Sequence, residues 1–402
     1  MTSRIYYTDA YCRRFEAVVT RVFEHDGRAA AVLDRTAFYP TSGGQPFDTG
    51  RITPHQGGTF GSAIDVVDTI DVDDDVVHLL SAPLGPAAAV TGDVDWVRRF
   101  DHMQQHTGQH VLSAAFDRLF NNRTVSFHMG AELSTIDLAQ EMSWEQIARA
   151  EDEANRVVWD DREVAIRFVS SEEADTLPLR KEPVRGGVLR LIDVKDFDLS
   201  ACGGTHVART GAIGAILVPA VEKFKGGVRV TFVCGARTLR TFRTLRESVA
   251  GSVRALSVLP QELPGSIERM QTEARDLRRT LKKFQESLAA HEAERLASHV
   301  VVEALDGWDA NGLKLIATTI TSRTSAAVAL FSTGSPVAVV ITRSPDRRVD
   351  AKAVLGALIE RFGGRGGGKA DLAQGGGLSG NLADICAAAR GLLRGSPGDS
   401  IP

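Results

Sequence analysis

Gln105-His106-Thr107-Gly108-Gln109-His110 is the stretch from which the fold and the chemistry of this sequence can both be worked out. Apolar residues recur at helical spacing across 103–119, and no Gly or Pro follows Gly108 there, so the pattern predicts a helix. Residues four apart lie on one face of a helix, with side chains about 5–6 Å apart. His106 and His110 can therefore hold one metal ion between them.

The same spacing returns about ninety residues later in Ala201-Cys202-Gly203-Gly204-Thr205-His206, which adds a thiolate and a third imidazole. One thiolate with three imidazoles is a ligand set that Zn²⁺ prefers. His206 is either the fourth ligand or a close neighbour that orients water. The alternatives are a polar helix face with satisfied histidines and a zinc knot that only holds the fold. The predicted metal residues are His106, His110, Cys202 and His206.

The regions around these motifs predict an α+β chain of four parts. Residues 1–92 carry short, partly alternating apolar runs between Gly- and Pro-rich turns, which predicts a small barrel-like or sandwich domain. Residues 93–240 combine helices with strands and hold both metal motifs. The predicted strands are 14–22, 29–34, 64–70, 76–80, 163–169 and 188–194, and the second predicted helix is 143–159.

The remaining two parts are a helical linker, 241–300, and an α/β domain, 301–402. Apolar residues at heptad spacing across 266–297 indicate a helical spacer or antiparallel hairpin, with Ser266 capping it after the break at Leu263-Pro264-Gly265. In the last part the patterns predict strands at 313–319, 326–332 and 337–342, a helix at 351–362, and a glycine-rich loop at 363–377.

The amino-acid composition narrows the class of protein, its location and its partners. At 402 residues, with 43% hydrophobic and 24% charged content, the chain is an ordinary globular protein without a membrane span or signal peptide pattern, so we expect it in the cytoplasm. Its four cysteines are too scattered for a disulfide framework. The net charge of −4 gives no overall attraction to nucleic acid, so any RNA contact must come from local basic patches.

The HxxxH and CxxxH pairs resemble the signature of the editing domain of alanyl-tRNA synthetase and of its free-standing AlaX relatives, which threonyl-tRNA synthetase editing domains share. Upstream, Thr36-Ala37-Phe38-Tyr39-Pro40-Thr41-Ser42-Gly43-Gly44-Gln45-Pro46 resembles the TxFYPxSGGQ loop of that family. Residues 363–377 are similar to the glycine-rich core of the DHHA1 domain, which marks the long AlaX class. The segment ahead of Thr36 is too short to hold an aminoacylation domain, so we do not expect this chain to charge tRNA. The sequence has no Asp-His-His motif, so we do not expect it to cleave phosphoesters.

This resemblance implies a zinc-dependent hydrolase that removes serine, and as a further candidate glycine, from mischarged alanine tRNA in trans. Thr36 would read the serine hydroxyl and Gln45 would line the pocket, against the alternatives of a buried strand threonine and a simple turn. Zinc would either activate water or position the substrate. Two other functions stay open: a non-catalytic tRNA-binding protein with structural zinc, and an editing hydrolase for another tRNA, such as that of the threonine system.

Contact with tRNA needs exposed cations, although such runs are often only solvated faces. We expect no ATP and no membrane partner, and the heptads together with the DHHA1-like tail favour a homodimer through the linker and the C-terminal domain. The predicted tRNA-binding residues are Arg98, Arg99, Lys223, Lys225, Arg229, Arg365 and Lys369.

Overall fold

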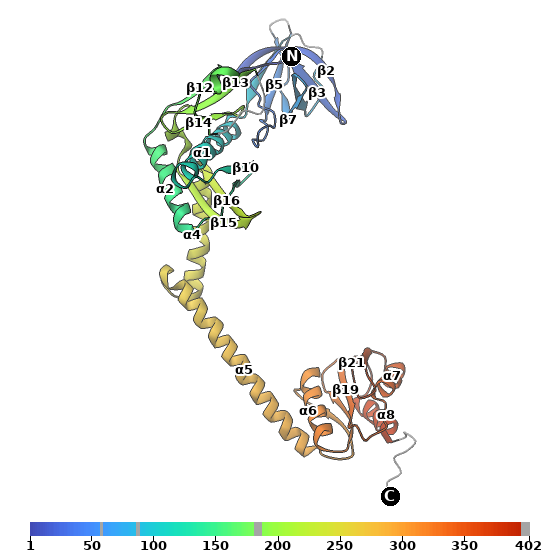
Figure 1. Ribbon diagram of the computed structural model, residues 1–402. Helices are drawn as coiled ribbons and strands as arrows, with labels where there is room; N and C mark the ends of the chain where they lie inside the picture. Colours follow the sequence, from blue (N-terminus) through green and yellow to red (C-terminus); the bar gives the residue numbers. More distant parts are fainter. Residues whose placement is uncertain (57–58, 86–88, 181–186, 395–402) are drawn as a thin grey trace. The chain divides into compact units, whose positions relative to one another are not determined.

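The computed structural model describes residues 1–56, 59–85, 89–180 and 187–394 (Figure 1). The chain divides into two compact units, Met1–Gly251 and Ser252–Pro402. Within the described ranges, no helix is long and apolar enough to cross a bilayer. The last eight residues of the predicted 301–402 domain lie outside the described residues.

The first unit begins with a largely antiparallel sheet that encloses apolar side chains such as Phe15, Leu33 and Ile52. Its order is β6-β5-β7-β8-β3-β2-β9, and β5 also pairs with β9, so the order returns to β5. The four strands predicted in this region are confirmed, whereas the expected barrel-like form stays a prediction. The strands are β2 (Arg14–His25), β3 (Arg28–Leu33), β5 (Gly50–Gln56), β6 (Thr59–Phe60), β7 (Ile64–Val72), β8 (Asp75–Leu80) and β9 (Ala89–Val94).

Two strands of this sheet, β5 and β9, escaped the sequence pattern because each carries a residue that usually interrupts strands. Pro54 lies within β5 and Gly92 within β9. Gly92 has a packing reason, since a Cβ there would lie 2.4 Å from the ring of Phe15. The glycine lets the core aromatic ring lie flat against the strand. Two further short strands, β1 (Ser3–Arg4) and β4 (Arg35–Thr36), pair in parallel beside this sheet.

The long helix α1 (Trp96–Phe120) runs through the middle of the first unit, where Arg99 and residues 102–116 are all buried. Asp95 caps its start, and Asn121 ends it in the left-handed conformation. A helix buried on every side is usually apolar, yet α1 carries buried His, Gln and Arg side chains. These polar groups require partners in the surrounding strands, and the site described below supplies many of them.

Two smaller antiparallel sheets flank α1. One has the order β10-β11-β16-β15 and packs, with α2 (Trp144–Trp159), around the apolar core that α1 shares. The other has the order β12-β13-β14. Ser143 and Gln146 form the capping box that starts α2, close to the predicted start. The strands are β10 (Thr124–Met129), β11 (Ser134–Leu138), β12 (Val164–Ser170), β13 (Val188–Val194), β14 (Asp198–Ala201), β15 (Ile216–Phe224) and β16 (Gly227–Cys234).

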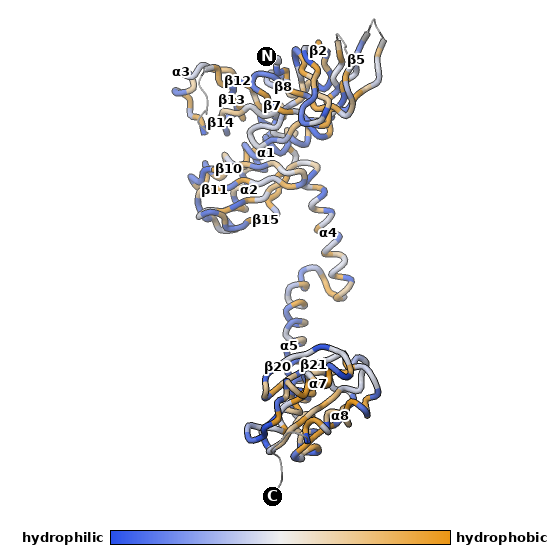
Figure 2. The backbone as a smooth tube through the Cα atoms, turned by 90° about the vertical axis from the view of Figure 1, so that its right-hand side faces the viewer, coloured by the Kyte–Doolittle hydropathy of each residue, from blue (hydrophilic) through white to orange (hydrophobic). Residues whose placement is uncertain are grey.

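The second unit contains α5 (Leu263–Arg295) and a five-stranded sheet of order β17-β18-β19-β21-β20. Alternate strand residues pack on opposite faces, with α7 and α8 covering one face and α6 with the end of α5 covering the other. Figure 2 shows apolar residues concentrated in this sheet and in α7 and α8. The elements are β17 (Val300–Leu305), α6 (Ala310–Arg323), β18 (Ala327–Ser332), β19 (Val337–Arg343), α7 (Ala351–Phe362), β20 (Arg365–Gly368), β21 (Leu372–Leu378) and α8 (Leu382–Arg394).

Three predictions for this part of the chain were wrong. Residues 313–319 lie in the helix α6 rather than in a strand, because Leu313, Ile316 and Ile320 form one buried helical face. Residues 363–377 are mostly the hairpin β20–β21 rather than a loop. Ser266 does not cap α5, since the helix begins at Leu263 and tolerates its proline in the first turn.

The linker is helical, as predicted, in α4 (Ala236–Leu256) and α5. The apolar side chains of the heptad pattern along α5 are exposed, among them Leu277 with 70% and Phe284 with 64% of its surface free. Their spacing is that of a helix–helix contact. The homodimer through this segment stays a prediction.

Candidate metal centre

Two segments far apart in the sequence meet at a group of three imidazoles and one thiolate. The helix α1 presents His106 and His110, and the segment that leaves β14 presents Cys202 and His206. One ligand atom from each residue lies within 4.8 Å of all the others. The Nε2 atoms of His106 and His206 each lie 3.4 Å from Cys202 Sγ.

Gly204 allows this approach. A Cβ at this position would lie 2.1 Å from His106 Cε1, so any other residue would push the imidazole away from Cys202. The second glycine of the motif is therefore explained by packing against α1, whereas a Cβ at Gly203 would meet only Tyr7, at 3.9 Å. The spacing of Cys202 and His206 depends on a backbone that has no side chain at this point.

Each of the three imidazoles is held from behind through its Nδ1 atom. The partners are Gln45 Oε1 at 2.8 Å from His106, Asp198 Oδ2 at 3.0 Å from His110, and Thr107 Oγ1 at 3.2 Å from His206. A hydrogen bond at Nδ1 leaves Nε2 as the atom available for a metal. The histidines are thus oriented as metal ligands usually are.

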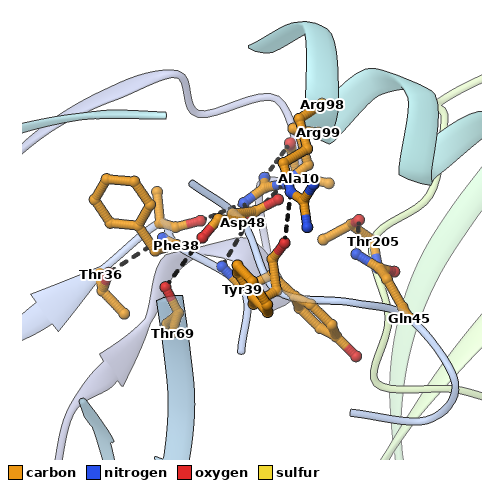
Figure 3. Close-up of polar contacts among 12 residues, drawn as sticks. Ala10, Thr36, Phe38, Tyr39, Gln45, Asp48, Thr69, Arg98, Arg99 and Thr205 are labelled. Atoms are coloured by element: carbon orange, nitrogen blue, oxygen red, sulfur yellow. Dashed lines mark hydrogen bonds and ion pairs between the residues drawn. The ribbon is translucent and has the colours of Figure 1, made fainter. Parts of the chain in front are cut away.

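Gln45 is itself fixed by Thr205, a member of the second metal motif. The Nε2 atom of Gln45 donates to Thr205 Oγ1 at 2.8 Å, and its Oε1 accepts from the Thr205 amide at 3.1 Å (Figure 3). One buried side chain from the loop between β4 and β5 therefore connects α1 with the segment after β14. The sequence placed Gln45 in the pocket but gave no sign of this double contact.

Asp198 is the charged partner of the group. Arg180 binds it through Nε at 2.5 Å, and Ser200 donates to it as well. Burial alone would raise the pKa of Asp198, but His110 and Arg180 outweigh burial and hold the pKa below its ordinary value. The sequence analysis missed both Asp198 and Arg180. The carboxylate four residues before Cys202 was the available signal.

The thiol of Cys202 is held in the form that binds metals. Its burial raises the pKa, yet the neighbouring His106 and His206 outweigh burial and hold the pKa well below 9. Burial also lowers the pKa of His206 to about 3, so that imidazole is neutral at physiological pH. Metals bind thiolates and neutral imidazoles.

The dimensions of the group fit a tetrahedral ion. With bonds of about 2.0 Å to nitrogen and 2.3 Å to sulfur, tetrahedral geometry places N and S about 3.5 Å apart. The two 3.4 Å distances from Cys202 Sγ agree with that value. The four residues therefore fit a metal ion, and the mixed ligand set matches the preference of zinc.

A cavity of about 730 Å³ opens directly over this group. Strand β10 and the residues around Cys202 line opposite parts of it, and α1 supplies His106, Gln109 and His110. The exposed Arg123 lies at its wall. The other lining residues are Tyr39, Ser42, Gly43, Thr124, Val125, Ser126, Phe127, Arg180, Ala201, Cys202, Gly203 and Gly204.

Thr36 lies apart from this cavity. It is completely buried, with its Oγ1 2.8 Å from His78 Nε2 and accepting a hydrogen bond from the Phe38 amide. Thr36 and Gln45 lie on opposite sides of the view in Figure 3. The structure thus joins Gln45 to the metal group, whereas it pairs Thr36 with His78.

Arg99 is a correction among the predicted tRNA contacts. Its side chain is completely buried, and it binds Asp48 at 2.9 Å, the Ala10 carbonyl at 2.9 Å and the Ala37 carbonyl (Figure 3). A guanidinium enclosed in this way holds the first sheet to α1 and has no surface to offer to RNA. The sequence shows only that two arginines follow each other. Which of them is buried depends on the side of α1 that each one occupies, and the sequence did not reveal that side.

The other predicted cations reach solvent to different degrees. Lys223 pairs with Glu141 at 3.1 Å, and Arg229 binds Asp137 at 2.7 Å. Lys225 is exposed, and Arg98 is half-buried with its Nε bonded to the Phe47 carbonyl at 2.9 Å. In the second unit, Arg365 and Lys369 are exposed on and beside the glycine-rich strand β20.

Comparison with known proteins places this arrangement in a family. The model of the threonyl and alanyl tRNA synthetase second additional domain matches residues 189–229, which include Cys202 and His206, and that of the DHHA1 domain matches residues 297–395. The alanyl-tRNA editing protein AlaX-L of Pyrococcus horikoshii is 30% identical over 398 residues, 93% of this chain and 94% of that protein. The chain belongs to the AlaX-L family of alanyl-tRNA editing proteins.

This chain also shares sequence with much longer enzymes. The alanine–tRNA ligase of Pyrococcus furiosus is 34% identical over 72% of this chain, which spans 32% of that ligase. That of Halobacterium salinarum is 33% identical over 94% of this chain and 42% of the ligase. Among solved structures, the C-Ala domain of the Aquifex aeolicus alanyl-tRNA synthetase matches 24% of this chain and 90% of that domain, at 27% identity and a TM-score of 0.22.

Proposed function

We propose that this AlaX-L family member is a trans-acting aminoacyl-tRNA deacylase that hydrolyses the ester between serine and the terminal ribose of alanine tRNA. Glycine is the second candidate amino acid. The observation that carries the proposal is the three-histidine, one-cysteine group beneath a cavity of about 730 Å³. Zinc is the proposed ion, held by His106, His110, Cys202 and His206.

The reaction needs an activated water and stabilisation of a tetrahedral oxyanion. Bound zinc supplies Lewis acidity, used either on water or to position the substrate. The chain's own residues orient the ligands: Gln45 holds His106, and Asp198 with Arg180 holds His110. In this proposal Gln45 is a positioning residue, because its amide is already bonded to His106 and Thr205.

Selection of the amino acid is assigned to the wall of the cavity. A second site that hydrogen-bonds a hydroxyl discriminates serine from alanine more sharply than a pocket sized for alanine can. Thr36 remains the proposed determinant of which amino acid is selected. Because its hydroxyl contacts His78, we propose that it acts indirectly, through the wall of the cavity. It anchors the start of the segment that carries Tyr39 and Ser42 to the cavity.

The partner in this proposal is mischarged alanine tRNA, in the cytoplasm and without ATP. Lys223, Lys225 and Arg229 on the hairpin β15–β16, and Arg365 and Lys369 beside β20, are the proposed phosphate contacts. We also propose that the chain divides into four parts at residues 92, 240 and 300. The first three of these cations would then lie in the second part, and the last two in the fourth.

The test is deacylation of four esters by the purified, metal-loaded protein: seryl-, glycyl- and alanyl-tRNA of alanine, and seryl-tRNA of threonine. We expect loss of serine from alanine tRNA while the alanyl ester survives. Cys202→Ala should abolish hydrolysis and metal binding together, whereas Cys386→Ala, a half-buried thiol of the second unit, should change neither.

Two results would redirect the proposal. Hydrolysis of the threonine-system ester in preference would assign the protein to another tRNA. Binding of alanine tRNA and of one metal ion, without hydrolysis of any ester, would support a tRNA-binding protein with structural zinc. The metal content should be measured by mass spectrometry in each preparation, so that an inactive sample is not simply an empty one.

A further inference from the structure

A second hollow lies at the first turns of α1, with a volume of about 570 Å³. We call it the α1 hollow. Arg98, Asp101 and His102 line it from α1, and Arg237 and Arg240 line it from α4. All of its lining residues belong to the first unit. His106 and His110 lie one and two turns further along α1, and no residue lines both hollows, so the α1 hollow is separate from the cavity over the metal group.

His102 is the feature of the α1 hollow that calls for a ligand. Only 3% of its surface is exposed, and its Nδ1 atom has no hydrogen-bond partner. The Nδ1 atom is sealed inside the protein, so a group in the hollow can reach only the other ring nitrogen, Nε2, which also makes no hydrogen bond among the described residues. Buried polar side chains in folded proteins nearly always have a partner, so an imidazole without one at the wall of a hollow points to a group that binds there. Burial and then the nearby Arg98 and Arg237 lower the pKa of His102 to about 3, so the imidazole is neutral.

The charges around the α1 hollow favour an anion. Its two carboxylates are occupied: Asp95 accepts from the Arg98 amide at 3.2 Å, and Asp101 binds Arg237 at 2.6 Å. Arg240 keeps 61% of its side chain exposed and lies 3.9 Å from Asp101. Arg98 uses Nε on the Phe47 carbonyl, and its guanidinium makes no other hydrogen bond among the described residues. The hollow is thus lined by three arginines and two carboxylates. Among the described residues, Arg98 and Arg240 both keep N–H groups that make no hydrogen bond.

Three segments of chain contribute to both the α1 hollow and the cavity over the metal group. Ser42 lines the cavity and Pro46 the hollow, while residues 123–127 line the cavity and Ala131 the hollow. On α1, His106 lines the cavity and His102 the hollow, one turn or about 6 Å apart along the axis. An RNA strand with its terminal ribose in the cavity can therefore reach the hollow with a phosphate that precedes it.

We propose that the α1 hollow binds one backbone phosphate of the unpaired 3′ end of the RNA, through Arg98, Arg240 and the Nε2 atom of His102. This inference rests on the proposed function, since it places a second part of the same substrate. It adds a contact that fixes how far the 3′ end enters the cavity. A phosphate contact of this kind positions the strand without reading its bases.

The test uses a minihelix RNA with the acceptor stem of alanine tRNA and its unpaired 3′ end, uncharged, in fluorescence anisotropy. Each phosphate of the unpaired end is replaced in turn by a neutral methylphosphonate. We expect one replacement to weaken binding to the wild-type protein about tenfold and to have no effect on Arg98→Gln. Arg98→Gln and Arg240→Gln should each lower the salt slope by about 0.7 per lost contact. Arg243→Gln, an exposed arginine of the same helix as Arg240, is the matched control.

A third variant separates binding from folding. His102→Leu should weaken binding of the minihelix severalfold while the midpoint of thermal unfolding stays the same or rises, because the variant removes a buried polar atom without a partner. If the wild-type protein neither binds the minihelix nor deacylates seryl-tRNA, the proposed function fails. If it does both, yet every methylphosphonate has the same effect on wild type and on Arg98→Gln, the inference is overturned. Competition by inorganic phosphate without such coupling would overturn it too, and would assign the hollow to free phosphate.

Discussion

At the scale of single residues, the metal group depends on side chains that lie behind it. Gln45, Asp198 and Thr107 each take the Nδ1 atom of one histidine, so the ring orientation is set before an ion arrives. Two of these three lie outside α1, Gln45 in the loop between β4 and β5 and Asp198 in β14. The orientation of the ligands is therefore a property of the whole first unit.

We expect Gln45→Ala to lower the affinity for zinc by about 10- to 100-fold, because His106 loses the acceptor that fixes its ring. Competition with a chromophoric chelator measures this affinity directly. Gln45→Glu, which keeps an acceptor oxygen at the same position, should stay closer to wild type. Equal affinities for wild type and Gln45→Ala would show that Thr205 and α1 orient His106 without the amide.

His78 gives a prediction for stability against pH. Burial lowers the pKa of His78 from 6.5 to about 4 in the folded protein. Between these values the unfolded chain binds a proton that the folded protein does not, so the contribution of His78 is complete above pH 6.5 and is lost as the pH falls toward 4. The free energy of unfolding of wild type relative to His78→Gln should fall by about 2–3 kcal/mol between pH 7.5 and pH 4.

Urea unfolding at both pH values, followed by a signal from the first unit, tests this expectation. His128→Gln, at an exposed position of β10, serves as the control and should leave the profile of wild type unchanged. A difference between wild type and His78→Gln that does not depend on pH would mean that His78 is solvated or charged in the folded protein. The hydrogen bonds of His78 to Thr36 and to the Ala31 carbonyl would then account for the difference.

At the scale of elements, the hairpin β20–β21 shows what its glycines do. Cβ atoms at Gly366 and Gly368 would lie 2.6 Å and 2.3 Å from backbone oxygens of β21, whereas a Cβ at Gly367 would meet nothing within 4 Å. The glycines at alternate positions therefore permit close approach of the two strands. Gly367 points the other way, on the same face of β20 as the exposed Arg365.

Gly366→Ala should lower the free energy of unfolding of the second unit by about 1–3 kcal/mol, as overpacking does elsewhere. Gly367→Ala is the matched control in the same strand and should change this free energy by less than about 0.5 kcal/mol. Chemical denaturation followed by Trp308 fluorescence reports on this unit. Equal effects of the two substitutions would contradict the register that pairs Gly366 with Gly375.

The same elements explain what the sequence could and could not reveal. The helices α1, α2 and α7 were predictable because their apolar residues recur at helical spacing and their starts carry capping residues. The helix α6 was mistaken for a strand because Thr318, Thr319 and Ile320 are β-branched, and only packing against the sheet reveals its buried face.

The residues of the site also separate into those that the sequence could predict and those that it could not. The metal residues were predictable because two HxxxH-like spacings carry their own chemistry, whereas Asp198, Arg180 and the burial of Arg99 depend on tertiary neighbours. A pattern in one sequence says which residue types recur, and contacts between distant strands leave no such pattern. Thr36 illustrates the same limit, since its partner His78 lies 42 residues away on another strand.

At the scale of the whole molecule, each of the two compact units has apolar cores of its own. Phe15, Phe116 and Phe232 lie in cores of the first unit, and Phe331 lies in one of the second. The metal group belongs to the first unit alone. The stability that a metal adds should accordingly act on one unit.

Calorimetry of the zinc-loaded protein should show two transitions, and a chelator should lower only one of them, by about 10 °C for a site saturated a thousandfold above its dissociation constant. Cys202→Ala should show the lowered transition with or without the chelator. A single transition that moves as a whole would show that the two units unfold together.

The distance along the chain between the two metal motifs has a consequence for biosynthesis. His106 and His110 leave the ribosome before Cys202 and His206, and at ordinary rates of elongation the interval is roughly 5–20 s. During that interval the nascent chain carries two imidazoles that bind copper or nickel more tightly than zinc. The thiolate that completes the set arrives last, together with Gly204 and the carboxylate behind His110. The four-residue group is therefore complete only after the first two hundred residues have been synthesised.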